Sequence, residues 1–448
     1  MVSIVILHIM QPSKQAINKM DQSKIMKDHV SIEVVELAKS LKGKIDTLNP
    51  LSKDCCIYRV PPKVRMLNET LYTPKIVSIG PLHHGREELK AMQEHKLRCL
   101  QQFLKRTHVH LVEFLTSIKD REAKLRNCYV ETINFGSDEF VEMVLLDAVF
   151  LIEIFLRCNP KICREVILDH IFTKPRMIKD IVLDIMLLEN QLPIFILDDL
   201  FTLAKTDVLG NSLSQLAKFF FKCHICKDVL IDENLIDSYF SKAKHFVDLL
   251  RICLQPPKRD DTKRLDDSEV VPNVTKLHQA GVKFKLAPTT MNLLDIRFNK
   301  GTLEIPKLTI GNMTEQLLRN LHIFEGLHCD HANYMNDYGV ILNRLLNTSK
   351  DVELLIHIGV IDNRILDSEG VSTLFQQLSK DARVDKENFY YSGLVKDLKG
   401  YYKSPCHKWK ANLKQNYFNT PWASISVIAA VIILVLTFIQ TVCSIVGL

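Results

Sequence analysis

The stretch SDEFVEMVLLDAVFLIEIFLRC, residues 137–158, is apolar on nearly every side of the helix that it would form. Glu142, Asp147 and Glu153 interrupt it at intervals that make insertion into lipid costly. A helix without charged residues on most of its sides belongs inside a large protein core. We therefore predict that this stretch is the central buried helix of a helical bundle.

A second stretch of the same kind, RMIKDIVLDIMLLENQLPIFILDDLFTLA, covers residues 176–204. Pro193 lacks a backbone donor and clashes with the preceding helical turn. It therefore either ends one helix or kinks a longer one near Asn190–Gln191. Amphipathic stretches on both sides continue the helical period, so the body is predicted to be mainly α-helical.

The periodicity changes to two beyond residue 281. Apolar residues alternate with polar ones on both sides of residue 290 and again after the turn sequence NKG; they are Val282, Phe284, Leu286, Leu294, Ile296, Phe298, Leu303 and Ile305. This alternation is typical of short strands in an antiparallel sheet, with a hairpin near Lys300–Gly301. The predicted fold class is mainly α (α+β): a large helical domain with a small antiparallel β-hairpin element and one C-terminal transmembrane helix.

The C-terminal segment WASISVIAAVIILVLTFIQTVCSIVGL, from residue 422 to the end, contains no charged residue. At about 1.5 Å per residue, a helix of this length crosses a hydrocarbon core of about 30 Å. We predict a single transmembrane helix at residues 422–447. Positive residues beside a span favour the cytosolic side, and four lysines precede it: Lys403, Lys408, Lys410 and Lys414.

The large domain is therefore expected in the cytosol, anchored in the plasma membrane or an endomembrane. Its extracytosolic placement stays open. Four glycosylation sequons, about as many as chance would deliver, do not decide the topology but offer a test of it, because glycans would be attached only outside the cytosol. The sequons begin at Asn68, Asn273, Asn312 and Asn347.

The composition of the sequence predicts the boundaries of the other segments of the chain. Residues 1–30 are predicted to be a flexible N-terminal arm, and residues 31–416 the mainly helical domain. Within it, QPPKRDDTKRLDDSEVVPN at 255–273 is charged and proline-marked, which is typical of an exposed linker or insert.

The charge and cysteine content exclude two classes of protein. The 58 Lys and Arg residues against 52 Asp and Glu residues give a net charge of +6. Because no long basic stripe is present, we expect no nucleic-acid partner. The 12 cysteines are scattered over a long chain, unlike the dense framework of a small secreted scaffold, so reduced thiols are expected.

Several long strings of the sequence resemble the plant family called domain of unknown function 247, or UPF0481. They are CCIYRVP (55–61), YTPKIVSIGPLHHG (72–85), LKAMQEHKLRCLQQFL (89–104), DIMLLENQLPIFIL (184–197), LHQAGVKFK (277–285) and IPKLTIGNMTEQLLRNLHIFE (305–325). The chain departs from the usual family form at Leu82 and Gln93. The resemblance implies a plant membrane protein with no named cofactor. Most members have no established activity, and some grass members are implicated in self-incompatibility.

Two groups of residues are candidates for metal binding. His83 and His84 follow a Gly-Pro turn, but adjacent side chains point in different directions and no pair of histidines has helical metal-ligand spacing. The alternative is a turn in which one histidine bonds the backbone. Cys223 and Cys226 have the Cys-x-x-Cys spacing of zinc or redox sites, yet no second such pair follows, so buried thiols are the alternative.

Carboxylates inside the apolar stretches are the candidates for catalysis: Asp147, Glu153, Asp184 and Glu189. Burying a charge is costly unless it is paired or its pKa shifts, so a group of these residues would make a general acid/base site. They would equally pair with arginines, for which Arg59, Arg65 and Arg176 are the candidates, and fix the helix register.

The prediction is a membrane-anchored plant protein that acts in recognition or signalling without being an enzyme, although the question of enzymatic activity is left open. Membrane lipid and a protein partner are expected, no cofactor is expected, and the oligomeric state is left open. The alternative is a membrane-tethered hydrolase or transferase that uses the buried carboxylates. Carboxylates lining one open cleft would favour the alternative, and carboxylates buried against arginines would favour recognition.

Overall fold

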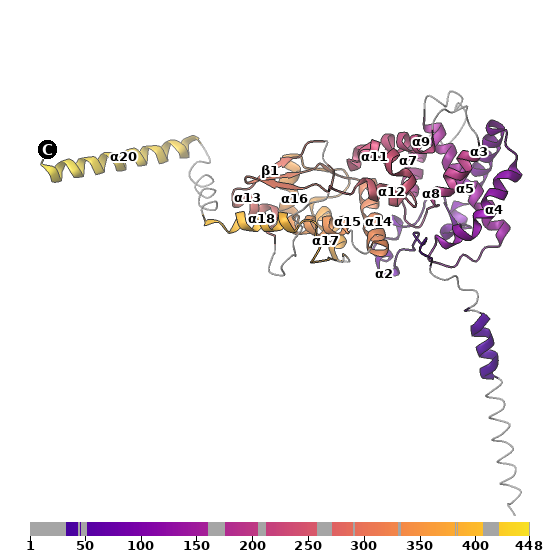
Figure 1. Ribbon diagram of the computed structural model, residues 1–448. Coiled ribbons are helices and arrows are strands. Elements are labelled where there is room, and N and C mark those ends of the chain that lie inside the picture. Colours follow the sequence, from indigo (N-terminus) through magenta and orange to yellow (C-terminus); the bar gives the residue numbers. More distant parts are fainter. Residues whose placement is uncertain are drawn as a thin grey trace, which may run out of the picture. The chain divides into compact units, whose positions relative to one another are not determined.

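The computed structural model describes residues 33–43, 45, 52–159, 175–204, 212–257, 271–289, 292–329, 333–380, 382, 384–405 and 421–447 (Figure 1). The chain divides into two compact units, Met1–Cys55 and Cys56–Leu448. In the first unit a helix covers residues 33–43. The predicted arm at 1–30 and most of the predicted linker at 255–273 lie outside the described residues, so their boundaries stay predictions.

Helix α5, Ser137–Cys158, is the centre of the first half of the second unit (Figure 1). Helices α3 (Ala91–Thr107), α4 (Leu111–Asn127), α8 (Ile194–Leu203) and α9 (Leu213–Phe221) pack against it. Glu142 is exposed, whereas Asp147 and Glu153 are buried. The prediction of a central buried helix is therefore confirmed.

The other elements of this half are short or complete the bundle. They are α2 (Pro62–Arg65), η1 (Glu69–Leu71), η2 (Pro81–His83), η3 (Glu87–Leu89), α7 (Pro175–Ile185), the π-turn η4 (Lys222–Cys226), α10 (Lys227–Val229), α11 (Glu233–Tyr239), η5 (Phe240–Lys242) and α12 (Phe246–Cys253).

Pro193 begins a helix, which differs from both alternatives derived from the sequence. Helix α7 ends at Ile185, and Pro193 is the N-cap residue of α8. Proline is tolerated at a helix start because the first backbone donors have no partner within the helix. Residues 186–193 are consequently an irregular turn between the two helices. Glu189, Asn190 and Gln191 lie in this turn.

The second half of the unit is joined to the first by the packing of α12 on α14. Its helices are α13 (Val274–Gln279), α14 (Asn312–His328), α15 (Tyr334–Leu345), α16 (Ser349–Ile358), α17 (Ser368–Lys380) and α18 (Ser392–Lys403). Buried hydrophobic residues from Val60 to Leu398 form one contiguous core cluster that includes both halves.

A small sheet contains the predicted hairpin. Strands β2 (Arg297–Asn299) and β3 (Thr302–Ile305) pair antiparallel across Lys300–Gly301, where both residues have positive φ. Two consecutive positive φ values are typical of the hairpin turns that match the twist of the strands.

The prediction that the whole sheet is antiparallel was wrong for β1 (Lys283–Leu286). This strand pairs parallel with β3, in the order β1-β3-β2. Alternation determines which side chains face the core, but not the direction of the neighbouring strand. A separate parallel pair joins β4 (Leu308–Ile310) to β5 (Ile361–Asn363).

Helix α20, Pro421–Val446, is the C-terminal element. Its window Ile428–Ile445 is long and apolar enough to cross a membrane, and none of that window is buried. It is the one helix with these properties in the described part of the chain.

A polar clamp at the candidate functional site

Residues 75–80, KIVSIG, form no helix or strand and yet enter the core; they are called the clamped segment below. Val77 and Ile79 are buried, and so is Ser78 between them. Buried backbone N–H and C=O groups require hydrogen-bond partners. Because no neighbouring strand supplies them here, side chains from α5, α7 and the turn after α7 do so.

Asp184, in the last turn of α7, accepts hydrogen bonds from three successive amides of the clamped segment. Lys75 N lies 2.9 Å from Oδ1, while Ile76 N and Val77 N lie 2.7 and 2.9 Å from Oδ2. Burial raises the pKa of Asp184 to about 6, against the opposing effect of these three bonds. The carboxylate thus takes the place of a neighbouring strand.

Asn190 and Asp147 bind three further backbone groups of the segment. Ile79 N donates to Asn190 Oδ1 at 2.7 Å, and Asn190 Nδ2 donates back to Val77 O at 2.9 Å. Gly80 N donates to Asp147 Oδ2 at 2.8 Å. These side chains therefore fix successive backbone groups on both sides of Ser78.

Lys96 of α3 is the counter-charge of Asp147. Its ammonium pairs with Asp147 Oδ1 and donates to Ser78 O at 2.6 Å. Both side chains of this pair are only 1% exposed. Burial raises the pKa of Asp147, and the attraction of Lys96 opposes that shift. One ion pair consequently joins α3, α5 and the clamped segment.

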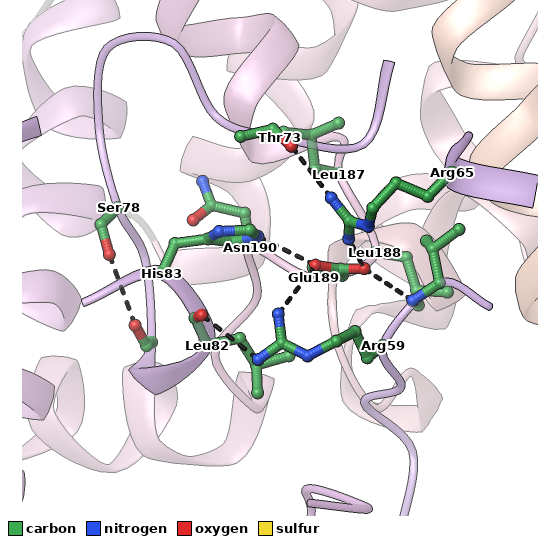
Figure 2. A network of polar contacts seen from close by, with 12 residues as sticks. Arg59, Arg65, Thr73, Ser78, Leu82, His83, Leu187, Leu188, Glu189 and Asn190 are labelled. Atoms are coloured by element: carbon green, nitrogen blue, oxygen red, sulfur yellow. Dashed lines mark hydrogen bonds and ion pairs between the residues drawn. The ribbon is translucent and has the colours of Figure 1, made fainter. Parts of the chain in front are cut away.

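Glu189 binds residues that precede and follow the clamped segment in the sequence (Figure 2). Its carboxylate accepts from Val60 N at 2.6 Å, pairs with Arg65 of α2, and lies 3.4 Å from Arg59 Nη1. His83 Nε2 lies 3.0 Å away. Burial raises the pKa of Glu189, but the bonds from His83, Val60 and Arg65 outweigh burial and hold this pKa below its usual value.

Asp147, Asp184, Glu189 and Asn190, together with Lys96, are called the polar clamp below. Of the four carboxylates predicted as catalytic candidates, the clamp contains three. Glu153 lies apart from it on α5, where it is enclosed by Arg106 and Arg157. Each carboxylate is thus directed at cations or backbone amides of its own surroundings. Arg176, an expected partner, is exposed on α7.

His83 and His84, which follow the Gly80–Pro81 turn, contact different neighbours. Arg86 Nη1 lies 3.4 Å from His83 Nδ1, and a guanidinium only donates, so Nδ1 accepts; Nε2 is the ring atom that contacts Glu189. His84 stacks edge-on against Phe135 at 5.4 Å between ring centroids. Adjacent histidines that face different neighbours make no joint metal site.

Cys223 and Cys226 are placed on the π-turn η4, where Cys223 is exposed and Cys226 is buried. Burial raises the pKa of Cys226 to about 12, so its sulfur is a thiol at neutral pH. His245, the histidine that follows this turn in the sequence, accepts from Asp248 N through Nδ1 and donates to Cys56 O through Nε2. Within the described residues, no group of three or more His, Cys, Asp or Glu side chains is placed to hold a metal ion.

Two buried acids with raised pKa values were not predicted from the sequence. Glu325 of α14 accepts from Asn336 N at 2.9 Å and Asn336 Nδ2 at 3.1 Å, and Asp337 of α15 accepts from Tyr390 N at 2.7 Å. Burial raises the pKa of Glu325 to about 7 and that of Asp337 to about 8. Both residues lie in amphipathic helices, where an acidic residue is typical of the solvent face, so the pattern gave no signal.

Gly80→Ala tests the close approach that the polar clamp requires. Gly80 has φ +76°, and a Cβ there would lie 2.5 Å from Gln191 O. Gly85→Ala is the control, since Gly85 has φ +78° with no atom within 4 Å of its Cβ position. We expect a loss of about 1 kcal/mol for Gly85→Ala and about 3 kcal/mol or more for Gly80→Ala, measured by urea unfolding. Equal losses would contradict the close approach.

Asp147→Asn tests the ion pair beneath the clamped segment. The substitution leaves the Lys96 ammonium buried without its counter-charge, which costs about 3–5 kcal/mol of unfolding free energy. Asp138→Asn is the matched control, because Asp138 pairs with Lys119 on the surface, with side chains 97% and 52% exposed. We expect the control to unfold at the wild-type urea concentration. A wild-type midpoint for Asp147→Asn would refute the role of this pair.

The buried acids predict a pH-dependent stability. A carboxyl group whose pKa is raised in the folded state binds more protons there than in the unfolded chain, so the unfolding free energy falls as pH rises to the folded pKa. Burial lowers the pKa of His245 to about 4, and this histidine works in the opposite direction only below about pH 6.5. We therefore expect stability to decrease from about pH 6.5 to 8, owing to Glu325 and Asp337.

Urea unfolding of the wild type and of Asp337→Asn across this pH range is the measurement. The variant should show a shallower decrease, because one of the two titrating groups is removed. Asp362→Asn serves as the control, since its partner Arg364, and also Lys307, hold the pKa of this partly exposed carboxyl below its usual value. A wild-type stability that is constant over the range would show that the two acids are ionised in the folded state.

Comparisons with known proteins agree with the resemblance that the motifs suggest. Residues 57–436 match the family DUF247, described as plant protein of unknown function. UPF0481 protein At3g47200 of Arabidopsis thaliana is 31% identical, over 87% of this chain and 86% of the relative. Putative UPF0481 protein At3g02645 of the same plant is 23% identical, over 91% of this chain and 93% of the relative. No solved structure matches the chain.

The matched region contains every residue of the polar clamp. It also begins at Ile57, close to the backbone that Glu189 holds. The chain therefore belongs to the DUF247 (UPF0481) family of plant proteins of unknown function.

Proposed function

We propose that the chain is a membrane-anchored component of recognition or signalling and that it is not an enzyme. The observation that carries this proposal is α20, an uncharged helix of 26 residues whose large apolar side chains are exposed. Exposed apolar surface of this extent and length finds its lowest free energy in a bilayer. Such an anchor confines the attached domain to a surface and raises its effective concentration for partners there.

The enclosure of the carboxylates supports recognition over hydrolysis or transfer. A general acid or base must reach a proton of the substrate. Asp147 is occupied by Lys96 and Gly80, Glu153 by two arginines, and Asp184 by three amides. These groups are directed at the protein itself, so they are suited to holding the fold.

The lysines before α20 favour a cytosolic domain. The sequons offer a sensitive check, because their acceptors differ in exposure. Asn68 and Asn347 are exposed, whereas Asn273 donates through Nδ2 to Asp351 Oδ2 at 3.0 Å. If the domain faced the lumen, glycans would be expected at the exposed acceptors and not at Asn273.

The anchor is tested with three forms of the protein: the full chain, a chain that ends at Ser404, and a chain in which an unrelated single-pass helix replaces α20. We expect the first and third forms to float with membranes after an alkaline wash and the second to stay at the bottom of the gradient. Crosslinking in intact membranes should capture the same protein partners with the first and third forms, because the domain performs the recognition.

Flotation of the form without α20, or loss of the full chain from membranes, would contradict the anchor. The alternative, a membrane-tethered hydrolase or transferase, is tested by an activity measurement. Turnover of an ester or phosphoester probe that disappears in Glu189→Gln, at an unchanged melting temperature, would contradict a non-enzymatic role.

A further inference from the structure

Cys56 and Cys128 directly precede two residues that form an isolated parallel bridge, and Cys128 is the C-cap residue of α4 with helical backbone angles. Ile57 N donates to Cys128 O at 2.9 Å, and Val130 N donates to Ile57 O at 3.1 Å. These two bonds make a parallel bridge between Ile57 and Tyr129. The cysteines are therefore the pair that directly precedes the bridged pair.

The backbone holds both cysteines in place. Cys56 N donates to Cys128 O at 2.9 Å, and Cys56 O accepts from His245 Nε2 at 3.0 Å. The Cys128 sulfur lies 3.3 Å from Lys124 O, one turn back along α4. Each cysteine is thus fixed independently of the other side chain.

The two thiols share one small environment. Cys56 and Cys128 are 1% and 4% exposed, and they form a cluster with Ile57 and Tyr129 that is separate from the main core. Burial first, and then Cys128 and Cys56, raise the pKa of the Tyr129 phenol. Both cysteines therefore belong to one buried cluster that includes Tyr129.

This placement suits a covalent link. The Cys56 amide bonds directly to the Cys128 carbonyl at 2.9 Å, so the two backbones are in contact, and disulfides join residues whose Cα atoms are about 4.4–6.8 Å apart. We propose that Cys56 and Cys128 are a disulfide-forming pair, which closes when the chain folds in the presence of a small-molecule disulfide such as oxidised glutathione. Both S–H bonds are broken, one S–S bond forms, and the two electrons and two protons reduce the oxidant to two thiols.

The link would join the beginning of the family-matched region to the end of α4. The loop that it closes contains α2, α3, α4 and the clamped segment. Closing such a loop restricts the unfolded chain and thereby stabilises the folded one. The redox state of the pair would also differ between compartments, because thiols stay reduced in the cytosol and are oxidised in the secretory pathway.

The test uses the full chain in detergent micelles, unfolded in urea and refolded in a buffer of oxidised and reduced glutathione. Remaining thiols are alkylated, and trypsin with glutamyl endopeptidase then releases DCCIYR, residues 54–59, and NCYVE, residues 127–131. We expect mass spectrometry to find these two peptides joined without reductant and separate with it. The oxidised protein should melt several degrees above the reduced one.

Two variants assign the link. Cys55→Ser leaves Cys56 as the one thiol of its peptide, so the joined species and the rise in melting temperature should both persist. Cys128→Ala should lose both. Complete alkylation of Cys56 and Cys128 in refolded Cys55→Ser, or a link that requires Cys55, would overturn the proposal. The measurement on Cys55→Ser holds even if Cys128→Ala fails to fold, and it does not depend on a protein partner.

Discussion

The structure depends on one constraint: a piece of irregular backbone is buried, and its amides must be satisfied without a neighbouring strand. Residues 75–80 enter the core between α5 and the turn after α7. Asp184 accepts three of the amides, Asn190 accepts a fourth, and Asp147 accepts a fifth. An unsatisfied buried amide costs about 1–3 kcal/mol, so losing these side chains together would cost about as much as the usual stability of a domain.

The remaining charges follow from this requirement. A buried carboxylate needs a counter-charge or several donors, which accounts for Lys96 at Asp147 and for Arg65 at Glu189. Glu189 in turn holds Val60 and His83, so the chain before and after the clamped segment is fixed as well. The strings that carry the family resemblance include Lys96, Asp184, Glu189 and the clamped segment itself. Each of these residues thus has a structural task in this fold.

Local pattern predicted a large part of the fold. Helix α5 was evident because its apolar residues cover all sides, and the hairpin because Lys300–Gly301 supplies a turn between alternating residues. The pairings could not be derived in this way. Asp184 and its partner Lys75 are far apart in the sequence, and periodicity says nothing about which distant backbone a buried carboxylate meets. The direction of β1 and the acids Glu325 and Asp337 were missed for the same reason, since each depends on a neighbour that is remote in sequence.

Hydrogen–deuterium exchange of the full chain tests the central claim most directly. Amides of exposed irregular loops exchange fast, whereas amides that donate to buried acceptors exchange only when the structure opens. If the polar clamp holds residues 75–80, Ile76, Val77, Ile79 and Gly80 should exchange as slowly as the buried amides of α5. Exchange of these four amides at the rate of an unstructured loop would contradict the account.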